Sequence, residues 1–122
     1  MSSHRRSVDH LLPLTPPMLH TLVALADGDK HGYAILKEIS RRTDGAVLLS
    51  AGTLYALVRR ATADGLIVET DERPDPALDD ERRRYYRLTS LGRRVAAAEL
   101  ARLESIVDMA RAKKLIPRRS PA

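Results

Sequence analysis

The sequence contains no cysteine, no phenylalanine and no tryptophan, and its aromatic content is limited to four tyrosines. Without cysteine there is no disulfide framework, no thiolate metal ligand and no cysteine nucleophile. A core must be built from Leu, Ile, Val and Ala, and it is possible because 43% of the residues are hydrophobic. A chain of 122 residues is long enough for one compact domain with an extension.

Long apolar runs are missing as well. No stretch approaches the ~20 consecutive apolar residues that span a membrane. The first residues, MSSHRRSVDHLLPL, include a basic pair, but their apolar stretch is shorter than a secretory signal requires. The sequence therefore predicts a soluble cytoplasmic protein without a membrane partner.

Patterns for catalysis and metal binding do not stand out. The histidines His4, His10, His20 and His31 lack the spacing of a zinc site, and no cysteine could complete one. The sequence also shows no Ser–His–Asp order, no Gly-rich phosphate loop and no catalytic carboxylate pair. We therefore expect neither an enzyme nor a metal ion or other cofactor.

Positive charge is in excess, with a formal net charge of +5 at neutral pH. A basic protein is attracted to polyanions, which include nucleic acid and anionic membrane surfaces. The total charge alone does not separate these partners, so the position of the basic residues has to decide.

Apolar periodicity and turn signals predict short helices in the first half of the chain. Residues 1–14 are expected to form a flexible arm, and Thr15 to cap a helix that has Pro16 in its first turn. A second helix is predicted over residues 32–43. A third follows Ser50, in the sequence SAGTLYALVRRATADGLI, and ends before a glycine suited to a left-handed conformation.

The second half predicts a β-hairpin and one long helix. Apolar residues 66–68 and the alternating residues 84–88 predict two strands, and the charged, Pro-containing stretch between them predicts a long connecting tip. Residues 46–49 are short and apolar and could also be extended. A helix is expected over 89–115, followed by a disordered basic tail at 116–122.

The long helix carries apolar residues at alternating spacings of four and three, which is the heptad pattern of a coiled-coil seam. We expect this helix to pair with the same helix of a second chain, with the first helix joining the interface. The alternative is that the helix packs on its own domain alone. The predicted interface residues are Leu19, Leu22, Val23, Ala96, Leu100, Leu103, Val107 and Ala110.

The order of helices followed by a hairpin predicts a winged helix-turn-helix over residues 15–88, in a mainly α fold with a small β hairpin. In this fold the third helix enters the major groove of double-stranded DNA. Small polar residues at its start allow close approach to a phosphate, and two arginines follow. The purely structural alternatives are that the small polar residues only cap the helix and that the arginines only form a solvated charged face. The predicted contacts are Ser50, Ala51, Thr53, Arg59 and Arg60.

Several short motifs resemble the PadR family of bacterial transcriptional regulators. They are HGYAIL at 31–36, GTLY at 52–55, DGLI at 64–67, RRYYRLT at 83–89, and Gly92. Each piece is weak alone, but their order and gaps are similar to the family's over about residues 15–115.

The resemblance implies a homodimer that binds a palindromic operator, usually as a repressor, and that is released by a small ligand or a stress signal. It implies DNA contacts by Tyr33 and Tyr55, and the single C-terminal helix is similar to that of the shorter subgroup. Arg82, Arg83 and Arg84 are expected to contact phosphate from the wing.

The sequence departs from the family pattern in two places that bear on DNA binding. Ala51 stands where the family usually has proline, and the tip DDERRR carries three acidic residues where a Gly-rich basic turn is typical. These acids could pair with the neighbouring arginines. The alternative functions are a winged helix used only for protein–protein contact, a basic protein that binds acidic lipid, and a MarR- or ArsR-type regulator, although ArsR-type metal sensing lacks its usual cysteine here.

Overall fold

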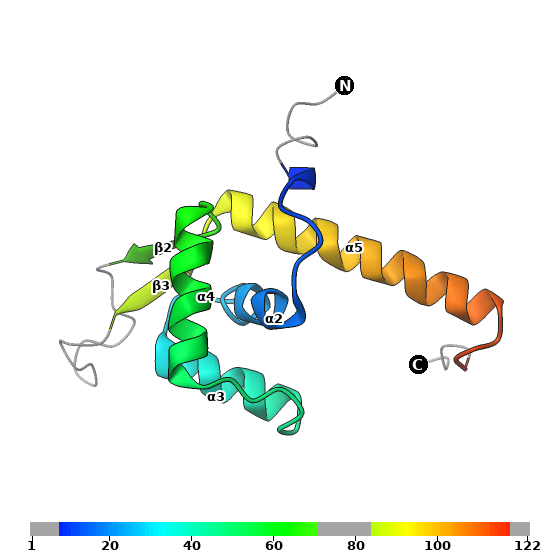
Figure 1. Ribbon diagram of the computed structural model, residues 1–122, viewed down its shortest axis with the longest axis horizontal. Helices are drawn as coiled ribbons and strands as arrows, with labels where there is room; N and C mark the ends of the chain where they lie inside the picture. Colours follow the sequence, from blue (N-terminus) through cyan, green and yellow to red (C-terminus); the bar gives the residue numbers. More distant parts are fainter. Residues whose placement is uncertain (1–7, 71–83, 118–122) are drawn as a thin grey trace.

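The protein is seen in a computed structural model that describes residues 8–70 and 84–117. Three helices and a small sheet form a winged helix-turn-helix, and a long fourth helix leaves this unit (Figure 1). The mainly helical fold with a β hairpin is therefore confirmed. The elements are α2 (Pro16–Ala24), β1 (Lys30–His31), α3 (Gly32–Arg42), α4 (Ala51–Ala63), β2 (Ile67–Thr70), β3 (Tyr85–Leu88) and α5 (Ser90–Ala112).

Each of these helices begins where a side chain caps it. Thr15, Ser50 and Thr89 accept hydrogen bonds from backbone N–H groups in the first turns of α2, α4 and α5. His31 does the same for α3, because its Nδ1 accepts from the backbone N–H of Ala34 at 3.1 Å. The helix starts expected at Thr15 and Ser50 are confirmed, and both follow from local side-chain chemistry.

One aliphatic core joins all the main elements. The fully buried side chains include Leu22 of α2, Ile35 of α3, Leu54 of α4, Ile67 of β2 and Val95 of α5. Since α2, α3, α4, α5 and β2 each contribute such a residue, burial of apolar surface fixes the helices against the hairpin. The core contains no Phe or Trp because the chain has none.

The sheet has a third strand that the sequence analysis did not predict. β1 lies against β3, with His31 opposite Tyr85, and β2 pairs with the other edge of β3, with Ile67 opposite Leu88. Both pairings are antiparallel. Residues 46–49, which could have been extended, form no strand.

The start of α5 packs closely on the chain that enters the hairpin. Gly65 has the expected left-handed backbone, with φ of +79°. A Cβ added to Gly92 would overlap the Leu66 carbonyl oxygen and would lie 2.7 Å from Cδ1 of Leu88. The backbone N–H of Thr89 donates to that same Leu66 oxygen at 3.1 Å. Gly92 therefore permits a backbone contact that any other residue would push apart.

Residues 8–14 pack on the domain, which differs from the expected flexible arm. Val8 is buried, and Leu14 is partly buried against the core. The Leu14 backbone N–H donates to Glu99 on α5, and Glu99 is only 1% exposed. Arg102 holds the same carboxylate through two hydrogen bonds of 2.8 Å. These contacts fix the segment beside α5 (Figure 1).

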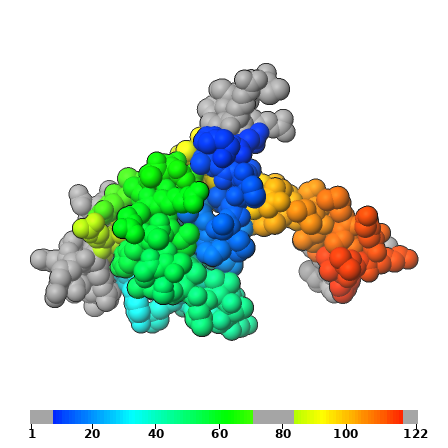
Figure 2. Space-filling model, viewed as in Figure 1, coloured from blue at the N-terminus to red at the C-terminus, as the bar shows by residue number. Residues whose placement is uncertain are grey.

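The later half of α5 stands clear of the domain (Figure 2). Leu100, Val107 and Met109 are exposed there, whereas Ala96, nearer the start of the helix, is buried in its own chain. Leu22 is fully buried too. The assignment of Leu22 and Ala96 to a dimer interface is therefore wrong, because both side chains already pack inside their own domain.

Candidate nucleic-acid interface

α4 presents one face to the core and the opposite face to solvent. Leu54, Val58 and Ala61 are buried, which fixes the rotation of the helix about its axis. Tyr55 and Arg59 lie on the exposed side, one turn apart. This is the arrangement that a helix needs if its outer face is to enter a groove.

The N-terminal end of α4 is exposed and carries small residues. Ser50 Oγ accepts from the Thr53 backbone N–H at 3.0 Å and donates to Thr53 Oγ1 at 2.9 Å. Ala51 and Gly52 add little bulk, and both are exposed. The first N–H groups of a helix lack intrahelical acceptors and favour anions. Ser50 is therefore a cap, and the amides beside it are open to a phosphate.

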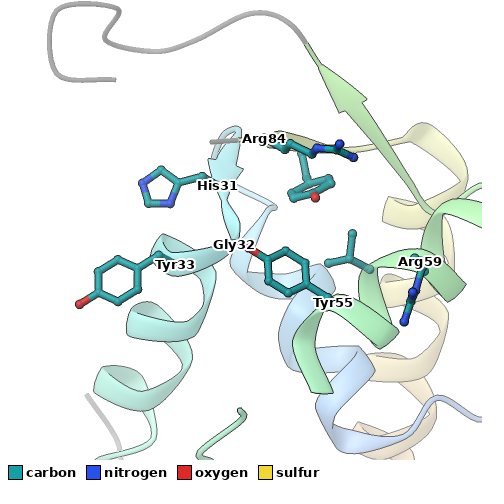
Figure 3. A pocket seen from close by; sticks show the side chains of 8 residues that line it. His31, Gly32, Tyr33, Tyr55, Arg59 and Arg84 are labelled. Atoms are coloured by element: carbon teal, nitrogen blue, oxygen red, sulfur yellow. The ribbon is translucent and has the colours of Figure 1, made fainter. Parts of the chain in front are cut away.

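A cavity of about 570 Å³ lies between the start of α3, the outer face of α4 and the wing strand β3 (Figure 3). Arg59 lies on α4, and Arg84 is the residue immediately before β3. Two positive groups from separate elements thus face one hollow, which suits a single anionic group. The lining residues are His31, Gly32, Tyr33, Tyr55, Val58, Arg59, Arg84 and Tyr86.

Gly32 lets Tyr55 cross to the start of α3. A Cβ at Gly32 would lie 3.3 Å from the Tyr55 hydroxyl oxygen and 3.5 Å from Cε1 of its ring. Figure 3 shows the ring between Gly32 and Arg59. Tyr55 remains 49% exposed, so its ring forms a wall of the cavity without closing it.

His31 and Tyr33 form the α3 side of the cavity. The two rings stack with centroids 6.5 Å apart, and the rings of His31 and Tyr85 make a T-shaped contact with centroids 5.4 Å apart. Lys37 Nζ lies 5.4 Å from the centre of the Tyr33 ring. Tyr33 is 60% exposed, so its hydroxyl is open to a partner. Packing and capping fix this side in one arrangement, which favours binding.

Tyr86 lines the same cavity, and its side chain is largely buried. Burial raises its pKa above the ordinary value of 10.0, and the negative charge of Glu69 acts in the same direction. The phenol therefore stays protonated at neutral pH and can donate a hydrogen bond to an anion. Arg84 Nε lies 3.7 Å from Glu69 Oε1, in a pair exposed enough that it contributes little to stability.

Arg60 lies apart from its neighbour Arg59. It lines a second cavity, of about 390 Å³, together with Asp64, Leu57 and residues of the N-terminal segment. Consecutive residues on a helix differ in direction by about 100°. The two arginines, which the sequence placed on one DNA-binding surface, therefore line different cavities.

The remaining predicted residues fall into two groups. Arg82 and Arg83 lie outside the described residues. On the predicted dimer seam, Val23, Leu100 and Val107 are exposed, whereas the side chains of Leu19, Leu103 and Ala110 are partly buried. Ile106 and Met109, 46% and 55% exposed, widen the apolar strip on α5. Unlike Leu22 and Ala96, these residues are available to a second chain.

The sequence analysis missed some residues of the site. Tyr86 and Gly32 were not assigned, although both lie in the motifs RRYYRLT and HGYAIL. The sequence analysis weighed the side chain of His31 only as a metal ligand, whereas this side chain caps α3. The two motifs were the sequence evidence that could have identified these residues, but only the fold shows that the motifs meet at one cavity.

Residues 8–70 and 84–117 contain neither a membrane span nor a metal-binding cluster. No helix there is long and apolar enough to cross a membrane. Within the same ranges, no three His, Asp or Glu side chains gather in a way that could hold a metal ion.

Comparison with known proteins gives the same assignment from sequence and from structure. Residues 21–98 match the family described as the transcriptional regulator PadR-like family. The chain is 36% identical over 88 residues to the transcriptional regulator Rv3488 of Mycobacterium tuberculosis, covering 72% of this chain and 76% of that protein.

Solved structures share the fold. A transcriptional regulator from Clostridium thermocellum matches with a TM-score of 0.65 and 25% identity, over 92% of this chain and 96% of the other. Bacillus subtilis PadR, solved in complex with operator DNA, matches with a TM-score of 0.59 and 19% identity, over 72% of this chain and 48% of that one. The family match over most of the chain agrees with the winged helix-turn-helix fold and its exposed recognition helix. This protein therefore belongs to the PadR-like family of DNA-binding transcriptional regulators, which are not enzymes.

Proposed function

We propose that this protein is a cytoplasmic, ligand- or stress-responsive repressor that binds a palindromic operator as a homodimer. The observation that carries the proposal is the cavity that Arg59 of α4 and Arg84, beside the wing strand β3, both line. A recognition helix and a wing that meet across one hollow can grip a duplex backbone between them.

In this proposal one backbone phosphate lies between α4 and the wing. Arg59 and Arg84 neutralise its charge, and the protonated hydroxyl of Tyr86 donates to it. Such contacts fix the register of the protein on DNA without reading sequence. Tyr33 holds a second phosphate beside α3.

Sequence is read from the exposed N-terminal half of α4. Thr53 and Tyr55 reach base edges in the major groove, and the small side chains of Ala51 and Gly52 allow the helix to approach closely. Ser50 supports this contact as the cap of the helix. Arg82 and Arg83 extend the phosphate contacts along the wing.

The homodimer rests on the exposed strip of α5. Leu100, Val107 and Met109 are apolar and exposed, and Leu103 lies between them on the heptad seam. Val23 of α2 joins the strip from the domain. Pairing through α5 sets the two copies of α4 about 34–36 Å apart, which is one turn of DNA.

Fluorescence anisotropy tests the proposal. The full chain is titrated onto a duplex from its own upstream region and onto a scrambled duplex, over a series of salt concentrations. We expect tight binding to the first duplex alone, with affinity that falls as salt rises because counterions are released. Equal, salt-sensitive binding to both duplexes would contradict sequence-specific recognition at this site.

A pair of variants locates the surface. Thr53→Ala combined with Arg59→Ala removes one groove contact and one phosphate contact, so we expect specific binding to be lost while the fold remains intact. Arg94→Ala, an exposed arginine on α5, serves as the control with the cavity intact. Unchanged affinity of the double variant would move recognition to another surface.

A further inference from the structure

The second cavity, of about 390 Å³, lies between the N-terminal segment and the C-terminal half of α4. Its two sides differ in origin. Leu11, Leu14 and neighbouring residues of the segment form one side, and Leu57 and Arg60 of α4 form the other. The proposed DNA surface leaves this cavity unused.

Most of its lining residues are apolar, but the lining also carries both signs of charge. Arg60 lies on α4, and Asp64 follows it by four residues, so the two side chains are neighbours on the helix surface. Nevertheless they do not pair with each other, and among the described residues neither side chain has an ion-pair partner. A cation and an anion are thus presented separately in the lining of a largely apolar hollow.

The apolar part is aliphatic. Met18 of α2, Leu57 of α4 and Leu66 contribute to it, and the imidazole of His10 also belongs to the lining. Such a lining takes up a branched or linear hydrocarbon chain through burial of apolar surface. A ligand that satisfies both parts needs an anion and a cation a few atoms apart on one end, and an aliphatic group on the other.

We propose that this cavity binds a free α-amino acid with an aliphatic side chain. Its carboxylate meets the guanidinium of Arg60, its ammonium meets the carboxylate of Asp64, and its side chain lies against Leu57 and Leu66. Neither charge is then buried without a partner. A fatty acid would leave Asp64 facing another carboxylate, and an amine would leave Arg60 facing another cation.

The position of the cavity gives the ligand access to DNA binding. One side belongs to the recognition helix α4, and the other belongs to the segment that Glu99 fixes on α5 through the Leu14 N–H. A ligand that contacts both sides has different affinities for two relative positions of α4 and the segment, which is what coupling requires. This regulatory role rests on the proposed function, whereas the binding site does not.

The test uses the full chain with L-leucine as the probe, followed by methyl NMR and calorimetry without DNA. We expect saturable shifts at Leu57, Leu66 and Met18, with a dissociation constant of about 1 mM for so small a ligand. Leucinamide lacks the carboxylate and 4-methylpentanoate lacks the ammonium, so each should bind about tenfold more weakly.

Three variants make the assignment specific. Arg60→Gln and Asp64→Asn should each weaken leucine binding about tenfold, whereas Arg59→Gln, on the other cavity, should leave it unchanged. Arg60 and Asp64 are both exposed, so the substitutions at these two positions should leave the fold intact. The proposal would be overturned if all three variants bound leucine equally well, or if 4-methylpentanoate bound as tightly as leucine. It would also be overturned if leucine caused no saturable shift of the methyl signals.

The same titrations separate this inference from the proposed function. Leucine binding with the expected pattern in a protein that binds no specific duplex would support the site and contradict the repressor. Specific duplex binding without leucine binding would support the repressor and contradict the amino-acid site.

Discussion

Replacing Gly92 by alanine should destabilise the protein, although alanine is the better helix former. Gly92 lies in the first turn of α5, and its added Cβ would overlap the Leu66 carbonyl oxygen and lie 3.0 Å from the Leu66 carbonyl carbon. Both atoms belong to the backbone, so no side-chain rotation relieves the clash. Either α5 or the chain that enters β2 must move.

The cost of that movement can be worked out from the contacts at this point. Moving α5 away breaks the hydrogen bond from the Thr89 N–H to the Leu66 oxygen and the one from Thr89 Oγ1 to the Gly65 oxygen. Each is worth about 1 kcal/mol, and forced overpacking costs about 1–3 kcal/mol. Higher helix propensity returns at most about 1 kcal/mol. We therefore expect a net loss of about 2–4 kcal/mol, a large part of the stability of a small domain.

The assay is urea unfolding followed by far-UV circular dichroism, at a fixed protein concentration because the stability of the proposed homodimer would depend on concentration. Gly52→Ala is the matched control, since it also lies in the first turn of a helix but its Cβ would meet only Ser50 Oγ, at 4.0 Å. We expect that variant to be more stable by up to about 1 kcal/mol. Equal midpoints for Gly92→Ala and the wild type would refute the close contact between α5 and Leu66.

Three further predictions concern the ends of the fold and the base of the wing. Leu103→Asp places a charge on the proposed α5 seam, so analytical ultracentrifugation should find a monomer; a variant that stays dimeric would show that the seam is misassigned. The pKa of Glu99 is lowered below its ordinary value of 4.5, first by hydrogen bonds from Arg102. Its carboxylate therefore stabilises the fold above that value, and the effect is lost as the pH falls through the lower folded pKa. Glu99→Gln should be less stable than the wild type in urea at pH 7, with a difference that disappears in acid; a constant difference would contradict the ionic contact. Asp29→Asn removes the carboxylate that accepts from Arg87 Nη2 at 2.8 Å, and should lower the free energy of unfolding by about 1 kcal/mol, while an unchanged value would mean that solvent screens the pair.

Features with a local cause were predictable from the sequence. Thr15 and Ser50 cap their helices because of their own hydroxyl groups, and Gly65 ends α4 because it tolerates a positive φ. The hairpin and α5 follow from alternation and helical periodicity. None of these predictions requires knowledge of a distant residue.

Features that depend on distant partners could not be predicted. β1 is two residues long and exists because His31 lies opposite Tyr85, far along the chain. Leu22 and Val23 are consecutive and equally apolar, yet one is fully buried and the other is 41% exposed. Periodicity identifies apolar positions, but it does not tell which of them the same chain already covers.

The base of the wing is joined to the turn that precedes α3. β1 pairs with β3, and Arg87 of β3 donates two further hydrogen bonds, of 3.1 Å and 3.2 Å from Nε, to the carboxylate of Asp29. A chimera that exchanges only the hairpin between relatives would therefore separate two segments that are built as one unit. Grafting a wing of different specificity onto this scaffold requires residues 29–31 to be carried with it.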